Sequence, residues 1–243
     1  MSQSKETSNP KEDDGIRNGG DILLQLRRLN INFVAIDFDQ TILSIHTGGV
    51  WTGTVPELLP LVRPELKFLI RTIAQASHRE SDGASDGEIH CAVVTFSTQI
   101  DVIRGVLSSI LDDDSKNNAY HKRIPIRGDD TSWKMPSPEL GWWPVTCVDF
   151  DLDDDLGKQA HMLSAIQEIE ARWQQQQQQK KQNHSNANQS ANTPKKFHIT
   201  KDTTLLIDDD QENIRIARAN GVRAIHLDPD HPERFLPDLF RLG

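Results

Sequence analysis

The sequence predicts an α/β fold, a doubly wound, Rossmann-like parallel sheet with helices on both faces and no large cap domain. Two observations predict it. Apolar runs rich in β-branched residues alternate with segments of helical periodicity. Three of these runs also end in polar, chemically useful residues, at Asp37, Thr95 and Asp208. Because ligands bind at the carboxyl ends of the strands in open parallel sheets, we expect these side chains to share one site.

The composition bounds the domain organisation. A chain of 243 residues fits one α/β domain with tails. Its hydrophobic fraction of 36% is low, which predicts that part of the chain is unstructured. We expect a disordered N-terminal tail over residues 1–20 and a single domain over 21–243. A glutamine-rich, low-complexity segment predicts a disordered insertion within that domain at about 174–197.

The charge and the cysteines bear on partners and location. A formal net charge of −9 disfavours nucleic acid and anionic membrane surfaces, since both require a basic face. No apolar stretch approaches the ~20 residues of a membrane span, and the N-terminus lacks an apolar signal core. Cys91 and Cys147 lie in strand-like runs, as small buried hydrophobes of a reducing compartment. We therefore expect a cytoplasmic protein without membrane partners.

The first half of the chain predicts two strands, each followed by a helix. The runs 32–36 and 89–96 are rich in β-branched and apolar residues, as buried parallel strands are. The helix after the first strand begins at Pro64, which suits a first helical turn, and the other begins near residue 100. A short helix capped by Asp21 precedes the first strand.

The second half predicts the rest of the sheet. An irregular excursion separates the helix near residue 100 from the next one, and the final segment is broken up by prolines. The expected elements are short strands at 124–126 and 145–150, a helix from Lys158, a strand at 203–207, a helix over 212–220 capped by Gly221, and a last strand at 222–227.

Residues 44–56 follow the first strand closely and are rich in glycine. They predict a hairpin or an irregular flap over the site. Trp51 within it is either a packing aromatic or a residue that faces substrate. His46 is either structural or in contact with substrate, and the structural interpretation is favoured for both.

Asp37, Asp39 and Thr41 end the first strand at spacings of two residues. Taken alone, this triplet could simply end a strand and cap a turn, as aspartates often do. Thr95, Lys158 and the pair Asp208-Asp209 could each be ordinary structural residues as well. Their joint occurrence at the ends of separate strands and the start of a helix favours a functional site.

The chain resembles the haloacid dehalogenase superfamily over roughly residues 30–228. Residues 37–41 match its D-x-D-x-T motif, and the strand ending at Thr95 is similar to its second motif. Lys158 resembles the third-motif lysine, with Lys134 as a rival that does not open a helix. The fourth motif is matched by Leu205, Ile207, Asp208 and Asp209, followed by Asn213, Ala217 and Gly221.

The resemblance implies a phosphatase of the minimal-cap type. Asp37 would attack phosphorus and form an aspartyl-phosphate, and Asp39 would act as general acid and base. An aspartate in this second position is similar to the phosphatase branch, since dehalogenases of the superfamily lack it. Mg²⁺ would be bound by Asp37, Asp208 and Asp209, and by the backbone carbonyl of Asp39.

The resemblance also implies that Thr41, Thr95 and Lys158 bind the substrate phosphate. Too few residues separate Thr41 from Thr95 for a large cap, although 113–144 could form a small lobe. The site is therefore expected to be open, which admits a phosphoprotein or a small phosphorylated metabolite.

Two other functions are compatible with these residue types. A receiver domain also combines Asp, Thr and Lys with an acidic pair, but there the acidic pair comes early, whereas Asp208-Asp209 comes last. A non-catalytic binding or scaffold protein could retain the fold.

Overall fold

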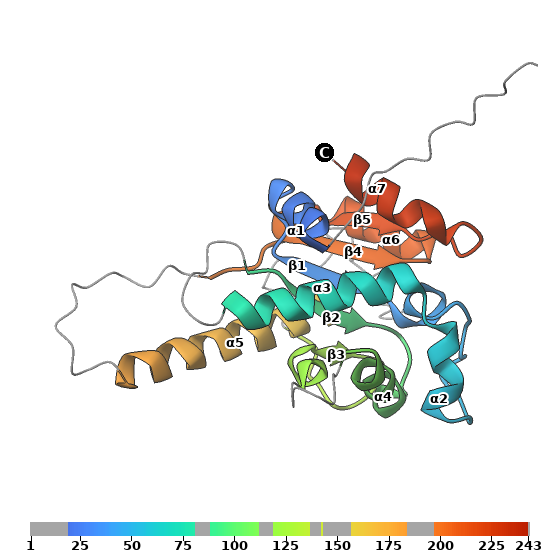
Figure 1. The fold of residues 1–243 in the computed structure, drawn as a ribbon, viewed down its shortest axis with the longest axis horizontal. Coiled ribbons are helices and arrows are strands. Elements are labelled where there is room, and N and C mark those ends of the chain that lie inside the picture. Colours follow the sequence, from blue (N-terminus) through green and yellow to red (C-terminus); the bar gives the residue numbers. More distant parts are fainter. Residues whose placement is uncertain are drawn as a thin grey trace, which may run out of the picture.

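The computed structural model describes residues 19–80, 88–111, 119–136, 142, 157–183 and 197–242. Within this part of the chain, parallel strands form one five-stranded sheet in the order β3-β2-β1-β4-β5 (Figure 1). The strands are β1 (Phe33–Ile36), β2 (His90–Val94), β3 (Ile126–Arg127), β4 (Thr204–Asp208) and β5 (Arg223–His226). The predicted α/β, doubly wound fold is confirmed. The predicted strand at 145–150 and residues 1–18 of the predicted N-terminal tail fall outside the described residues, whereas Gly19 and Gly20 belong to the first helix.

The strand order places one reversal in the middle of the sheet. The chain runs outward from β1 to β2 and β3, then returns to form β4 on the other side of β1. In the register, Ile36 lies between Val93 of β2 and Ile207 of β4. Asp37 and Asp208 therefore leave adjacent strands at this switch point, where open α/β sheets bind their ligands.

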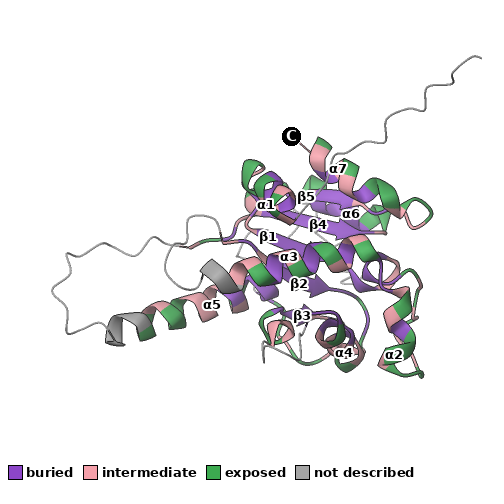
Figure 2. Ribbon diagram, in the orientation of Figure 1, coloured by how far each residue is buried: buried purple, intermediate pink, exposed green. Residues whose placement is uncertain are grey.

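Helices cover both faces of the sheet. They are α1 (Gly19–Arg28), α2 (Val55–Leu58), α3 (Pro64–Glu80), α4 (Ile100–Leu111), α5 (Gln159–Asn183), α6 (Gln211–Ala219) and α7 (Phe235–Arg241). The alternation of strand side chains divides the core: Val34 and Ile36 of β1 pack with α1, α3, α4 and α7, whereas Phe33 and Ala35 pack with α5 and α6. Figure 2 shows the strands buried except at some of their ends, as expected for a sheet covered on both faces.

Two helices differ from the predictions: α5 is longer than expected, and α7 was not expected. Helix α5 continues through the glutamines to Asn183, so the first part of the expected disordered insertion is helical. Glutamine is a good helix former, which explains the extension. The proline-broken tail contains α7, because Pro237 lies in the first turn, where no intrahelical N–H is needed. Residues 184–196 are not among those described.

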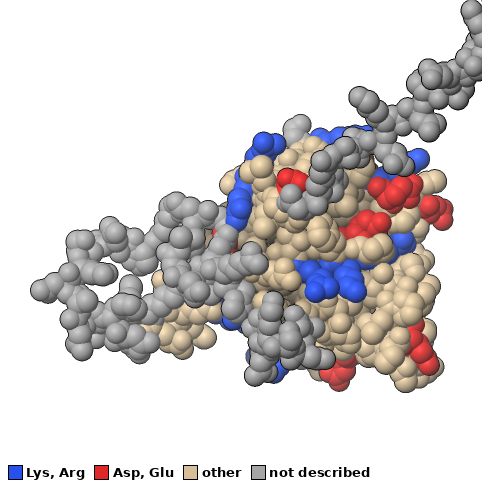
Figure 3. All heavy atoms as spheres, viewed as in Figure 1, with Lys and Arg blue, Asp and Glu red and all other residues tan. Residues whose placement is uncertain are grey.

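The segment after β1 is an irregular flap rather than a hairpin. Its only described strand-like contact is a single bridge between Leu43 and Val62, and the flap leads into α2. Of the possible lobe at 113–144, the described residues are 119–136 and 142, and they contain the 3₁₀ turn Tyr120–Arg123 and the edge strand β3. On the face in Figure 3, acidic and basic side chains occur in separate small groups. No helix in the described ranges combines the length and apolarity that crossing a bilayer requires.

Candidate active site

A buried ion pair lies at the switch point of the sheet. Asp37 follows β1 directly, and Lys158 lies at the start of α5, with its Nζ 2.8 Å from Asp37 Oδ1. Gly157 has a φ of +49°, which lets the chain turn into α5 just before the lysine. Lys158 Nζ also lies 3.7 Å from the centroid of the Phe96 ring, a cation–π contact. Only 2% of Lys158 is exposed, so its ammonium is held in place rather than free in solvent.

Three carboxylates gather beside this ion pair. Oxygen atoms of Asp37, Asp208 and Asp209 lie within 4.8 Å of one another. Asp208 accepts hydrogen bonds from Asn213 Nδ2 (3.2 and 3.3 Å) and from the backbone N–H of Asp210 (2.9 Å). These donors orient Asp208, but they do not neutralise the combined negative charge of the cluster.

Burial changes the protonation of these groups. It raises the pKa of Asp208 to about 7, with a further rise from the charge of Asp37. The pKa of Asp37 is also raised, chiefly by burial, although the Lys158 ammonium acts to lower it. The pKa of Asp209 is raised by burial, despite a hydrogen bond from Thr41. One lysine is thus too little positive charge for three carboxylates, and an all-oxygen set of this kind fits a hard divalent cation such as Mg²⁺.

Asp39 anchors the flap. It lies in the turn after β1, next to Gln40, whose φ is +56°. Its carboxylate accepts hydrogen bonds from Thr47 Oγ1 (2.8 Å) and Thr47 N (3.2 Å), and His46 Nδ1 lies 3.2 Å from Asp39 Oδ2. The Asp39 side chain is 13% exposed and lines the pocket, so solvent or a bound molecule can reach it.

An open pocket of about 240 Å³ is lined by all of the predicted site residues except Thr41. Four of its lining residues, Gln40, Phe96, Ser97 and Asp210, were not predicted, because only tertiary structure shows which neighbours of a motif face the site. Two flap glycines with positive φ complete one wall, and their sequence signal predicts only a turn. The lining residues are Asp37, Asp39, Gln40, His46, Gly48, Gly49, Thr95, Phe96, Ser97, Lys158, Asp208, Asp209, Asp210 and Asn213.

Thr41 does not line this pocket, contrary to the expectation that it binds phosphate. It is fully buried, and its Oγ1 donates to Asp209 Oδ1 at 3.0 Å. The positive φ of Gln40 turns the chain so that Thr41 supports Asp209 from within. Thr95 does line the pocket, and its Oγ1 accepts from the backbone N–H of Ser97 (3.2 Å), which leaves its own hydroxyl proton for a ligand.

The two lysine candidates are clearly separated. Lys134 is exposed and is not among the residues that line the pocket, whereas Lys158 contacts Asp37.

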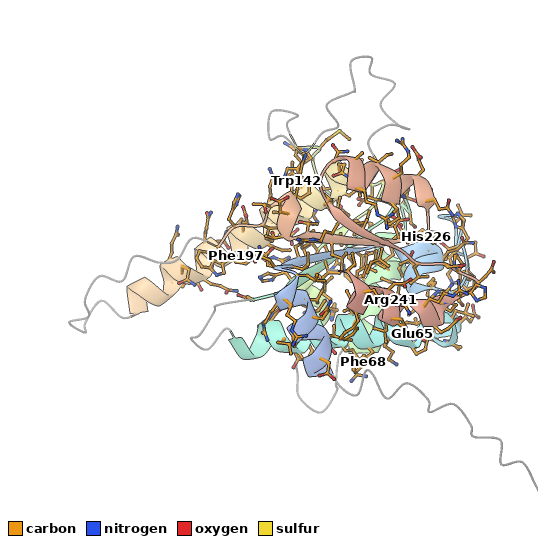
Figure 4. The ribbon with its side chains drawn as sticks, turned by 90° about the horizontal axis from the view of Figure 1, so that it is seen from above. Glu65, Phe68, Trp142, Phe197, His226 and Arg241 are labelled. Atoms are coloured by element: carbon orange, nitrogen blue, oxygen red, sulfur yellow. The ribbon has the colours of Figure 1, made fainter. Side chains whose placement is uncertain are left out.

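Trp51 packs against the core and its backbone exchanges hydrogen bonds with the Gln99 side chain, as the packing interpretation requires. His226 marks this end of the sheet in Figure 4, and its Nε2 lies 2.8 Å from the carbonyl oxygen of Asp209.

The chain matches no protein-family model, no curated protein and no solved structure. What the site can do chemically therefore follows from its own residues and their geometry.

Proposed function

We propose that the protein is a Mg²⁺-dependent phosphatase of the haloacid dehalogenase type, which hydrolyses phosphate monoesters through an aspartyl-phosphate on Asp37. The observation that carries this proposal is the contact between Asp37 and Lys158 beside Asp208 and Asp209, at the switch point of the sheet. A carboxylate in contact with an ammonium, next to a cation site, is the combination that nucleophilic attack on a phosphate dianion requires.

In the first step, an oxygen of Asp37 attacks phosphorus while the bond from phosphorus to the ester oxygen breaks. Asp39 gives its proton to the departing alkoxide, which leaves as an alcohol. In the second step, Asp39 takes a proton from water, the water oxygen attacks phosphorus, and the acyl phosphate bond to Asp37 breaks. The products are inorganic phosphate and the regenerated Asp37 carboxylate.

Positive charge and hydrogen-bond donors stabilise both steps. Lys158 balances the charge of Asp37 and of the incoming phosphate, and the hydroxyl of Thr95 donates to a phosphate oxygen. Mg²⁺ bound by Asp37, Asp208, Asp209 and the Asp39 carbonyl would supply further positive charge that offsets the repulsion between carboxylate and phosphate. Thr41 and Asn213 act through Asp209 and Asp208, which they orient.

The substrate is a phosphate monoester on a small molecule or a protein. The pocket is open to solvent, so the leaving group need not be small.

The test is hydrolysis of 4-nitrophenyl phosphate by the native chain and by Asp37→Asn, with and without Mg²⁺. We expect turnover that requires Mg²⁺ and falls by roughly 10⁴-fold in the variant, because the nucleophile is lost. Asp238→Asn is the matched control, since Asp238 is a half-exposed carboxylate in α7 that pairs with Arg241 and does not line the pocket. Mg²⁺ binding without turnover of any phosphate monoester would replace the proposal with a non-catalytic binding function.

A further inference from the structure

A second cavity, of about 100 Å³, lies near the amino-terminal ends of the strands. Its apolar wall includes Ile73 and Ala74 from α3, Cys91 from β2, Ile124, and Ile169 from α5. Figure 4 shows this end of the sheet at Phe197, opposite the end marked by His226. The cavity is therefore separate from the candidate active site, and none of its lining residues has a role in the proposed reaction.

The shortness of β3 explains why this space exists. β3 pairs with β2 only at Val93 and Val94, so β3 does not extend along the first residues of β2, His90 and Cys91. Helices α3 and α5 lie on the two sides of this gap, and the turn that holds Arg123 and Ile124 closes it. A strand edge enclosed in this way offers a ligand both apolar walls and polar partners.

One polar group in the cavity lacks a hydrogen-bond partner. His90 Nε2 is buried and has no hydrogen bond, and the carboxylate oxygen Glu88 Oε1 is 3.6 Å away. Burial lowers the pKa of His90 to about 4, with a further decrease from Arg172, so the ring is neutral at pH 7. A buried nitrogen without a partner is costly, and a bound molecule with a polar group would satisfy it.

The charges around the cavity favour an anion. Arg123 is exposed on the turn that closes the cavity. Arg172 lines it as well and shares Glu168 with Arg127. Together with Glu88, the two lining arginines carry one net positive charge, although the whole chain carries −9. A guanidinium without competition from several acids is a preferred partner for a carboxylate.

We infer that this cavity binds a small aromatic carboxylate. The ring lies against the apolar wall beside Trp173, in a cavity of about 100 Å³ that opens at its mouth. The carboxylate lies at the mouth, where it accepts hydrogen bonds from Arg123 and from His90. Binding here does not depend on the proposed phosphatase activity.

The test uses 4-fluorobenzoate as the probe and follows its fluorine NMR line during titration with the full chain. We expect saturable binding that weakens by about tenfold in Arg123→Glu, because the charge at the mouth is reversed. Lys122→Glu is the matched control: it makes the same change of charge on the neighbouring exposed residue, which does not line the cavity. Binding should remain unchanged in Lys122→Glu.

Two more measurements separate this cavity from the candidate active site and from a purely apolar pocket. Asp37→Asn should leave the affinity unchanged, since the candidate active site lies at the other end of the sheet. Fluorobenzene should bind at least about fivefold more weakly than 4-fluorobenzoate, because it lacks the carboxylate. The inference is overturned if the native chain shows no saturable binding, if Arg123→Glu and Lys122→Glu weaken binding equally, or if fluorobenzene binds as well as the acid.

Discussion

The two ends of the sheet differ in charge and in chemistry. At the carboxyl ends of the strands, aspartates surround a single lysine in an open pocket of about 240 Å³. At the amino ends, arginines and apolar side chains surround a cavity of about 100 Å³. Both sites include residues in or next to β2 and α5, and the middle of each of these elements packs in the core. In a doubly covered parallel sheet the polar chemistry is thus confined to strand ends, because the strand interiors must be apolar.

The largest expected difference is between the effects of replacing the cationic residue at each end of the sheet, Lys158 or Arg123. In Lys158→Met we expect kcat to fall by about 10³-fold, because a preorganised charge at the reacting phosphate is lost. The free energy of unfolding should also fall by about 3–5 kcal/mol, since Asp37 remains buried without its partner. Steady-state kinetics and urea denaturation measure the two effects.

Arg123→Met is the matched variant at the other end. Arg123 is exposed, so we expect less than about 1 kcal/mol of destabilisation and no change in kcat. Equal losses of activity in the two variants would contradict the assignment of distinct roles to the two ends.

Two buried threonines give a finer comparison. Thr41 donates to Asp209 at the carboxyl end, whereas Thr204 Oγ1 donates to the Thr200 carbonyl (2.7 Å) at the amino end of β4. Both are fully buried, so valine in either place should cost about 1–2 kcal/mol of stability. Only Thr41→Val should weaken Mg²⁺ binding, by about tenfold, because Asp209 loses its orienting donor.

Isothermal titration with Mg²⁺ separates the two variants. If Thr204→Val weakens Mg²⁺ binding as much as Thr41→Val does, the loss reflects general destabilisation and the positioning role of Thr41 is wrong.

The acidic end should also respond to pH. The pKa of Asp208 is raised in the folded protein to about 7, so its contribution to the stability of the metal-free chain is present at low pH and is lost as the pH rises through 7. Mg²⁺ must displace this proton, so Mg²⁺ affinity should rise about tenfold from pH 6 to pH 8.

Mg²⁺ titrations at the two pH values measure this change, and Asp208→Asn should bind Mg²⁺ weakly at both. Equal affinity of the native chain at pH 6 and pH 8 would mean that no group of the cluster titrates in this range.

The smallest effect is expected beyond both ends, in the projecting part of α5. Gln178 is exposed there, and Figure 2 shows this half of the helix extending away from the buried core. Gln178→Gly should lower local helix stability by about 1 kcal/mol and leave kcat unchanged. Amide hydrogen exchange would show faster exchange near residue 178 only. Faster exchange in the strands as well would mean that the glutamine segment supports the core.

Local patterns in the sequence predicted most of the sheet and half of the site. Apolar runs with β-branched residues locate strands wherever burial on both faces leaves no alternative. The carboxyl ends of such strands converge by topology and helices begin beside them, which is why Asp37 and Asp208 meet Lys158 at the start of α5 as predicted. The role of Thr41 was not predictable in this way, since it depends on the positive φ of Gln40, a non-glycine residue.

The cavity at the amino ends of the strands could not be predicted from the sequence either. It exists because β3 pairs with β2 at two positions only. No single residue signals that outcome. The helix through the glutamines of α5 was not predicted for a related reason, because low complexity argues against a core but not against a helix anchored at one end.

Helix α5 connects the candidate active site at one end of the sheet with the cavity at the other end. Lys158 precedes its first turn, and Arg172 lies roughly 20 Å further along its axis, at 1.5 Å of rise per residue. A packed helix moves as a rigid rod, so a molecule that displaced the Arg172 turn along the axis would also displace the ammonium beside Asp37. Thermodynamic reciprocity would then apply to the two ligands. Phosphate bound beside Lys158 would change the affinity of the cavity for its ligand by the same factor by which that ligand changes the affinity for phosphate.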